Sequence, residues 1–147
     1  MKLKQISVPI ENSRSRLLEL TRALAEKGIN LRALNLVDTG DFGLLRILVS
    51  DVVTSRQVLM QMGIPARVEE VVAVDIDDRP GQFSELLDAL IQADIRIKYT
   101  YACAGMNSGR ATLVFSFNDN DRAVAVLKEK HAEVLDARTL GMREAAA

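Results

Sequence analysis

The chain is poor in the residues on which most catalytic and metal sites depend. Among its 147 residues there are one cysteine, one histidine and no tryptophan. Because Cys103 has no second cysteine to pair with, it forms no disulfide within the chain, and a reducing cytoplasm is the expected location. His131 and Cys103 alone cannot supply a zinc cluster. No nucleophile–histidine motif, HExxH helix or Walker-type phosphate loop is present. The sequence therefore predicts no catalytic residues, no metal and no cofactor.

An excess of one charge and a long apolar run are also lacking. The 19 basic and 20 acidic residues leave a net charge of −1, which argues against electrostatic capture of nucleic acid or of an anionic membrane. No apolar stretch approaches the roughly 20 residues that span a bilayer. The start, MKLKQISVPIENS, lacks the continuous apolar core of a signal peptide. A composition of 48% hydrophobic and 27% charged residues is typical of a soluble globular protein.

What the sequence does contain is an internal repeat. Shifted by 66 residues, the chain overlays itself without a gap from strand to helix to turn. The coincidences include Val8 on Val74, Glu19 on Glu85, Leu24 on Leu90, Ile29 on Ile95, Gly43 on Gly109, Val58 on Val124 and Ala66 on Ala132. We interpret this as a duplication with a seam near residues 70–71. The predicted domains are therefore 1–70 and 71–140, followed by a frayed C-terminal tail at 141–147.

Both units show the same order of periodicities. Apolar alternation predicts strands, and helical spacing ending at glycine predicts helices. In the first unit the predicted strands are 4–10, 31–37, 44–49 and 66–70, and the helices are 17–24 and 54–62. In the second unit the strands are 71–77, 95–104, 109–117 and 133–138, and the helices are 81–93 and 120–130. This β-α-β-β-α-β order predicts an α+β fold of two tandem ferredoxin-like units, with antiparallel sheets and helices on one face.

The middle strands are apolar on both sides. Leu31, Ala33 and Val37 alternate with Leu34 and Leu36. Helices on one face of a sheet cover only one of these two sets. Either the two units pack on each other within the chain, or a second copy covers the other face. We expect the second arrangement, a homodimer.

The segment DDRPGQF, residues 77–83, joins a predicted strand to a predicted helix. A helix start presents unpaired N–H groups and a partial positive charge, which suit a carboxylate. Gly81 has no side chain to block backbone approach, and Pro80 restricts the turn before a ligand arrives. Asp77 or Asp78 could accept an ammonium. An ordinary strand-to-helix turn would need the same residues, so this segment alone does not establish binding.

The arrangement resembles the ACT domain family, small ferredoxin-like modules that bind amino acids and regulate metabolic enzymes. More narrowly, it is similar to stand-alone bacterial proteins made of two ACT units. The resemblance rests on DDRPGQFSELLDALIQADI, ENSRSRLLELTRALAEKGINLRAL and DTGDFGLLRILVSD, and it covers residues 3–140. It implies a ligand beside the loop between the first strand and first helix, with another ACT unit forming the adjacent wall. The implied ligand-binding residues are Asp77, Asp78, Arg79, Pro80, Gly81 and Gln82 in the second unit, and Glu11, Asn12, Arg14, Ser15 and Asn30 in the first.

The first unit departs from this pattern. At the offset of 66, Arg14 and Ser15 take the places of proline and glycine. Ser15 adds a Cβ that hinders backbone approach, although its hydroxyl could cap the helix. Arg14 could bind a carboxylate, or the site has decayed. Conversely, the second unit has Arg96 where the first has Asn30, so one site per chain could combine Asn30 with the Pro80–Gly81 loop.

Four other features allow two readings each. Tyr99, Tyr101 and Cys103 share one strand face and are expected in a core or a dimer contact rather than in a nucleic-acid surface. Cys103 itself is expected to be an inert buried thiol. His131 is expected to cap a helix end. The pair Asp38 and Asp41 could hold a metal or an ammonium, but turn propensity explains it equally well.

The sequence thus predicts a non-catalytic amino-acid sensor whose partners are a small amino-acid ligand and a second copy of the chain, with a metabolic enzyme as a further partner. The alternative is a structural or regulatory subunit of an amino-acid biosynthetic enzyme, similar to that of acetolactate synthase, without ligand binding of its own. An enzyme on this frame is the weakest reading, because no base, nucleophile and anion-holding set converges in the sequence.

Overall fold

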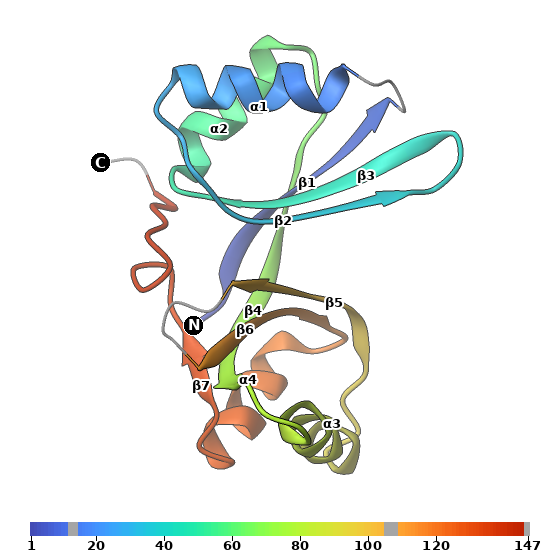
Figure 1. Ribbon diagram of the computed structural model, residues 1–147, viewed down its shortest axis with the longest axis vertical. Helices are drawn as coiled ribbons and strands as arrows, with labels where there is room; N and C mark the ends of the chain where they lie inside the picture. Colours follow the sequence, from blue (N-terminus) through green and yellow to red (C-terminus); the bar gives the residue numbers. More distant parts are fainter. Residues whose placement is uncertain (12–14, 105–108, 146–147) are drawn as a thin grey trace. The chain divides into compact units, whose positions relative to one another are not determined.

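The computed structural model describes residues 1–11, 15–104 and 109–145 (Figure 1). The predicted order of elements is confirmed, except that the strands 66–70 and 71–77 form one strand. The strands are β1 (Leu3–Glu11), β2 (Leu31–Asp38), β3 (Phe42–Val49), β4 (Arg67–Asp77), β5 (Ile97–Ala104), β6 (Arg110–Phe117) and β7 (Glu133–Leu135). The helices are α1 (Arg16–Glu26), α2 (Val52–Gln61), α3 (Gln82–Gln92) and α4 (Asn120–Glu129).

The chain forms two compact units. The N-terminal unit comprises Lys4–Glu69 and Gly141–Ala147, and the C-terminal unit comprises Met1–Leu3 and Glu70–Leu140. Strand β4 passes from one to the other. The predicted strands 66–70 and 71–77 are therefore one continuous strand, because no turn residue interrupts the apolar run at the seam.

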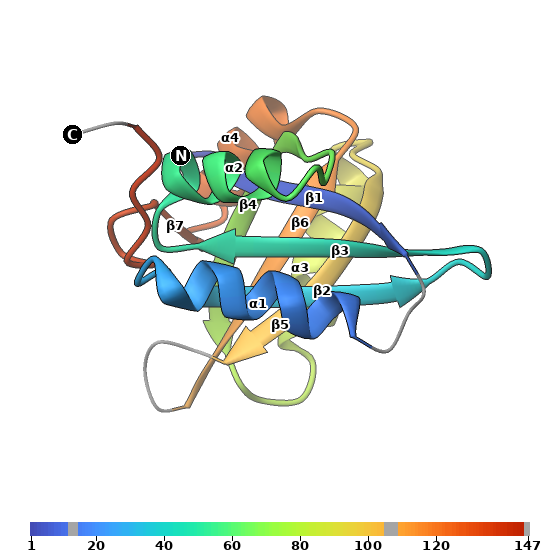
Figure 2. The same cartoon turned by 90° about the horizontal axis from the view of Figure 1, so that it is seen from above.

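Each unit has the ferredoxin-like strand order. In the N-terminal unit the order is β2-β3-β1-β4, and in the C-terminal unit β6 and β7 flank β4 while β5 lies beyond β6. The pairings β1–β3, β2–β3, β4–β6, β4–β7 and β5–β6 are antiparallel. Figures 1 and 2 show α1 and α2 together on one face of the first sheet, and Figure 1 shows α3 and α4 together on one face of the second. The predicted fold class is confirmed.

The gapless overlay of the two units is wrong beyond β2. Helices α1 and α3 do start 66 residues apart, as predicted. Leu45, however, pairs with Val8, while Leu113 pairs with the equivalent Val74. Structurally equivalent residues in the β3 and β6 region therefore lie 68 apart, and α2 and α4 show the same spacing. Two residues are thus added between β5 and β6 relative to the N-terminal unit.

Helix α3 is fixed by its apolar stripe. Leu86 and Leu90, four residues apart, are buried in a core that also contains Val72, Val74, Phe115 and Leu127. The Phe115 ring stacks on Phe117 at 5.0 Å and on Phe83 at 6.4 Å between centroids. Burying a leucine side chain contributes about 1.5–3 kcal/mol, so this stripe anchors the start of α3 against the end of β4.

Strand β2 keeps exposed apolar side chains. Leu34, Leu36 and Val37 are 44%, 44% and 42% exposed, whereas Ala33 is buried. The chain therefore leaves part of this strand uncovered, in line with the two-sided apolar pattern of its sequence. The homodimer stays a prediction.

The C-terminal segment is attached to the N-terminal unit. The backbone N–H of Arg143 donates to the Ser50 carbonyl at 2.8 Å, and that of Val52 donates to the Arg143 carbonyl at 2.9 Å. The Arg143 guanidinium also pairs with Asp51, and the Met142 side chain is buried. For residues 141–145 the expected frayed tail is therefore wrong, because backbone bonding and one buried methionine suffice to hold a segment that has no periodicity. Among the described residues no helix is both long and apolar enough to cross a bilayer.

Candidate ligand-binding site

The loop between β4 and α3 is a tight turn held by its own backbone. The N–H of Asp78 donates to the Gly109 carbonyl at 2.9 Å, and that of Arg79 to the Asp77 carbonyl at 3.0 Å. The N–H of Gln82 donates to the Arg79 carbonyl at 3.3 Å. The structure thus gathers the predicted residues 77–82 at the start of α3.

Gly81 is the N-cap of α3 and has a φ of +91°. This left-handed conformation disfavours any residue with a side chain. The Gly81 carbonyl accepts the Glu85 N–H at 3.0 Å, but the N–H groups of Phe83 and Ser84 find no acceptor within the described part of the chain. Apart from Pro80 and Gln82, its neighbours in the chain, no described residue would lie within 4 Å of a Cβ built on Gly81. The helix start therefore leaves donors unpaired beside open space.

The two loop carboxylates differ in their surroundings. Asp77 Oδ1 accepts from Arg110 Nη1 at 2.6 Å, and its Oδ2 lies 3.8 Å from Arg79 Nε. Asp78 is exposed and forms no ion pair with any described residue. Of the two candidates for binding an ammonium, Asp78 is therefore the one left unpaired.

Arg110 is a residue beside this loop that the sequence analysis missed. Its Nη2 donates to Glu133 Oε2 at 2.8 Å and lies 3.4 Å from the Asp75 carbonyl. The hydrogen bond that Arg110 donates to Asp77 is the main cause that raises the pKa of Arg110 above its usual value, and the charges of Asp77, Glu133 and Asp75 add to it. Its pairing opposite Asp77 across β4 and β6 follows from the strand register, which two separate periodic runs do not reveal.

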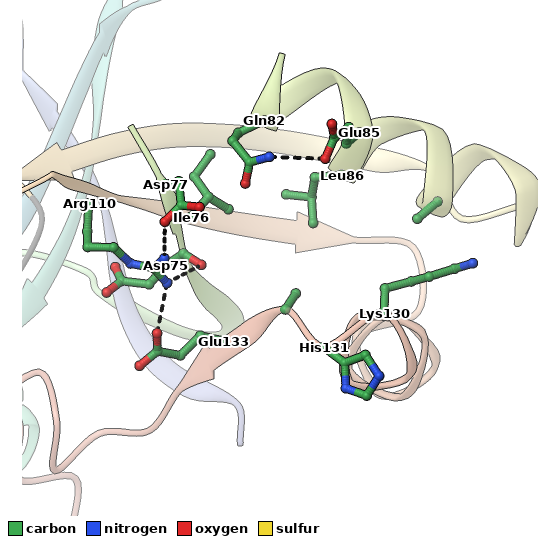
Figure 3. A pocket seen from close by; sticks show the side chains of 12 residues that line it. Asp75, Ile76, Asp77, Gln82, Glu85, Leu86, Arg110, Lys130, His131 and Glu133 are labelled. Carbon is green, nitrogen blue, oxygen red and sulfur yellow. Dashed lines mark hydrogen bonds and ion pairs between the residues drawn. The ribbon is translucent and has the colours of Figure 1, made fainter. Parts of the chain in front are cut away.

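A cavity of about 350 Å³ lies beside these groups in the C-terminal unit (Figure 3). It is lined by the end of β4, one side of α3, Arg110 and the turn from α4 into β7. Asp77 and Gln82 of the predicted loop line it, whereas Asp78, Arg79, Pro80 and Gly81 do not.

The loop of the N-terminal unit is described only in part. Asn12 and Arg14 lie outside the described residues, and Glu11 is exposed at the end of β1. Ser15 is the N-cap of α1, but its side chain makes no capping hydrogen bond, so the helix cap that its hydroxyl could have formed is not present. The described residues therefore show no hydroxyl cap at this helix start.

Asn30 lies at the opposite end of its own sheet from Glu11. Its N–H donates to Ser50 Oγ at 2.8 Å, and its carbonyl accepts the Ser50 N–H at 2.9 Å. Glu11 instead pairs with Phe42, at the far end of β3. Within the N-terminal unit these two predicted ligand residues are thus separated. The combination of Asn30 with the Pro80–Gly81 loop stays a prediction.

The remaining sequence candidates have structural explanations. Burial first, and then the charge of Asp75, raises the pKa of the Cys103 thiol. Tyr101 is buried. Asp38 Oδ1 accepts the Gly40 N–H at 2.8 Å, which is a turn contact. His131 follows the C-cap of α4, with a φ of +58°. Across residues 1–11, 15–104 and 109–145, no group of three or more His, Cys, Asp or Glu side chains could hold a metal ion.

Comparisons with known proteins agree with this architecture. The family model of the ACT domain pair matches residues 1–142. A crystal structure of protein BT0572 from Bacteroides thetaiotaomicron has a TM-score of 0.90 and 34% identity, covering 96% of each chain. The ligand-free regulatory subunit of aspartate kinase from Thermus thermophilus has a TM-score of 0.64 and 16% identity, covering 87% of this chain and 89% of that one.

The corresponding subunit from Thermus flavus has a TM-score of 0.58 and 16% identity, covering 87% of this chain and 90% of that one. At such identities the two kinase subunits show likeness of fold alone. No curated protein sequence matches the chain. The family model, which matches residues 1–142, shows that the chain belongs to the ACT domain family, as an ACT domain pair.

Proposed function

We propose that this ACT domain pair is a cytoplasmic, non-catalytic regulatory protein that binds an amino acid at the β4–α3 loop. The observation that carries the proposal is the start of α3, where the N–H groups of Phe83 and Ser84 have no acceptor among the described residues. The family resemblance supports it, because ACT modules are expected to take an amino acid beside this loop. The fold likeness to regulatory subunits of aspartate kinase is in keeping with a regulatory role.

The loop offers complementary groups for both charges of an amino acid. Its carboxylate would accept hydrogen bonds from the unpaired N–H groups at the α3 start, where the helix dipole adds a partial positive charge. Its ammonium would contact Asp78, whose carboxylate has no ion pair among the described residues. Charge-assisted hydrogen bonds of this kind contribute about 1.5–3 kcal/mol each where water is excluded. A neighbouring ACT unit is expected to form the other wall.

Regulation would follow if the amino acid had different affinities for two conformational states of the protein. An amino acid that binds one arrangement of the ACT units more tightly shifts the population towards that arrangement. A partner enzyme or a change in oligomeric state would then report the shift. This step needs no chemistry on the ligand.

Isothermal titration of the chain with each of the twenty amino acids tests the proposal. We expect at least one to bind, and we expect Asp78→Asn to weaken that binding about tenfold or more. Asp94→Asn is the matched control, since Asp94 is also exposed but lies after the far end of α3. Folded protein that binds none of the twenty would refute the ligand site.

A second candidate is a subunit that docks on an enzyme or on its own copy without binding a ligand. The exposed apolar side chains of β2 and of the start of β3 favour this reading, since Leu36 and Phe42 are 44% and 56% exposed. Light scattering of the pure protein and capture from a lysate of the source cells test it. A stable complex that is insensitive to every amino acid would support this candidate over the sensor.

A further inference from the structure

The cavity in the C-terminal unit, which we call the charged notch, has an apolar floor between two charged ends. Figure 3 shows Arg110 with Asp77 and Glu133 at one end, and Lys130 with His131 at the other. Ile76, Leu86, Ala89 and Ala132 supply apolar lining. A volume of about 350 Å³ suits a small metabolite.

The N-terminal unit provides an internal comparison. It has a smaller notch of about 200 Å³ in the same place. All eight residues that line it have equivalents lining the charged notch, at a spacing of 66 up to α1 and of 68 from β3 onwards. In the order N-terminal unit then C-terminal unit, the pairs that change in character are Pro9 and Asp75, Arg16 and Gln82, Phe42 and Arg110, Gly63 and His131, and Pro65 and Glu133.

The fold therefore does not require charges at these positions. In the N-terminal unit, two prolines and a phenylalanine line the equivalent notch, whereas the C-terminal unit has two carboxylates and a guanidinium at these three positions. His131 is notable among these, because it holds a left-handed backbone at φ +58° where the N-terminal unit has Gly63 at φ +69°.

The charges indicate the ligand. Asp75, Asp77, Glu85 and Glu133 line the notch against two permanent cations, Arg110 and Lys130. Arg110 is already bonded to Asp77 and Glu133, and Arg79 lies 3.8 Å from Asp77. With Asp75, three carboxylates thus face two guanidinium groups at this end of the notch, which leaves one negative charge in excess. The opposite end presents an exposed ammonium.

We propose that the charged notch binds an amino acid with a cationic side chain. The side-chain cation lies against Asp77 and Glu133, the methylene groups cover Leu86 and Ala89, and the carboxylate reaches Lys130 and His131. This site goes beyond the loop site above. It shares Asp77 and Gln82 with the loop, but it does not use Asp78 or the N–H groups at the α3 start.

Titration calorimetry of the full chain with L-lysine and with norleucine, which has the same carbon chain without the terminal ammonium, tests the proposal. We expect lysine to bind at least tenfold more tightly. Lys130→Met and Glu133→Gln should each weaken lysine binding about three- to fivefold, the range for partly exposed ion pairs. Lys128→Met and Glu129→Gln are matched controls, since both residues are exposed on α4 and outside the notch, and neither should change the affinity.

The outcomes separate this site from the loop site. Lysine binding that Asp78→Asn leaves intact and Lys130→Met weakens supports the notch. Lysine binding that Asp78→Asn abolishes and Lys130→Met leaves intact places the ligand in the loop and overturns the proposal. Equal affinity for lysine and norleucine, or no binding of lysine at all, overturns it as well, while leaving the binding of another amino acid at the loop open to its own titration.

Discussion

Replacing His131 by glycine should stabilise the C-terminal unit and, at the same time, lower the affinity of the charged notch for L-lysine. His131 has a φ of +58°, and its structural equivalent in the N-terminal unit is Gly63, at +69°. Both residues end a helix with the backbone N–H bonded into the last turn: that of His131 reaches the Lys128 carbonyl at 3.0 Å, and that of Gly63 reaches the Met60 carbonyl at 3.0 Å. The two positions thus differ in the side chain and not in the backbone.

The magnitude follows from two opposing terms. A left-handed conformation costs a residue with a side chain about 1–2 kcal/mol. Glycine loses more conformational freedom on folding than histidine does, and this entropy cost offsets about 0.5–1 kcal/mol of the gain. The net gain in the free energy of unfolding should be about 0.5–1 kcal/mol, or about 1–4 °C in Tm for a chain of this size.

Urea denaturation of the wild type and of His131→Gly measures this gain, and Asp94→Gly is the matched control. Asp94 also has a positive φ, of +57°, at the end of α3, but it does not line the charged notch. Both variants should be more stable, and only His131→Gly should bind L-lysine less tightly. A less stable His131→Gly would refute the strain argument, and equal effects of the two variants on binding would refute the role of the imidazole.

Three further predictions concern other sites. Gly81→Ala should cost about 1–2 kcal/mol of unfolding free energy in urea denaturation, because alanine disfavours a φ of +91°; a neutral effect would contradict the assigned backbone. The pKa of Asp51 is lowered, first by the Thr54 N–H and also by Arg143. Its charge therefore stabilises the fold above its unfolded pKa of about 3.9, and this contribution disappears as pH falls through the folded pKa. Asp51→Asn should flatten the acid side of the curve of stability against pH, and an unchanged curve would contradict this. Because burial raises the pKa of Cys103, its reaction with a thiol reagent should be slow at pH 7 and much faster in denaturant; equal rates would show an accessible thiol.

The order of elements could be predicted from sequence because each helix buries a regular stripe and each strand alternates. The predicted helix 81–93 is α3 within one residue at each end, since Leu86 and Leu90 fix its buried face and Gly81 marks its start. The same reasoning missed the added pair of residues after β5. Because side chains alternate with a period of two, a shift of two keeps every strand residue on its face, and Leu113 overlays Ile47 at a spacing of 66 as well as it overlays Leu45 at 68.

The candidate site was only partly accessible from sequence. The turn residues at Asp77–Gln82 could be recognised in the sequence, because proline and glycine follow a strand end there. Arg110 and Glu133 could not, because each becomes a neighbour of Asp77 or Asp75 only through strand register. Recognising the charged notch also requires a comparison of equivalent positions such as Phe42 and Arg110. These positions are 68 residues apart, a spacing that only the structure shows.

The most direct test of the central claim is an NMR titration of the nitrogen-15-labelled chain with each of the twenty amino acids. The claim is that unpaired N–H groups at the start of α3 hold the carboxylate of an amino acid. We predict that at least one amino acid shifts the amide signals of Gly81, Phe83 and Ser84 in a saturable manner, with smaller shifts at the far end of α3. If these three signals stay fixed while the protein is folded, or if they move no more than those of exposed amides elsewhere, the claim is contradicted.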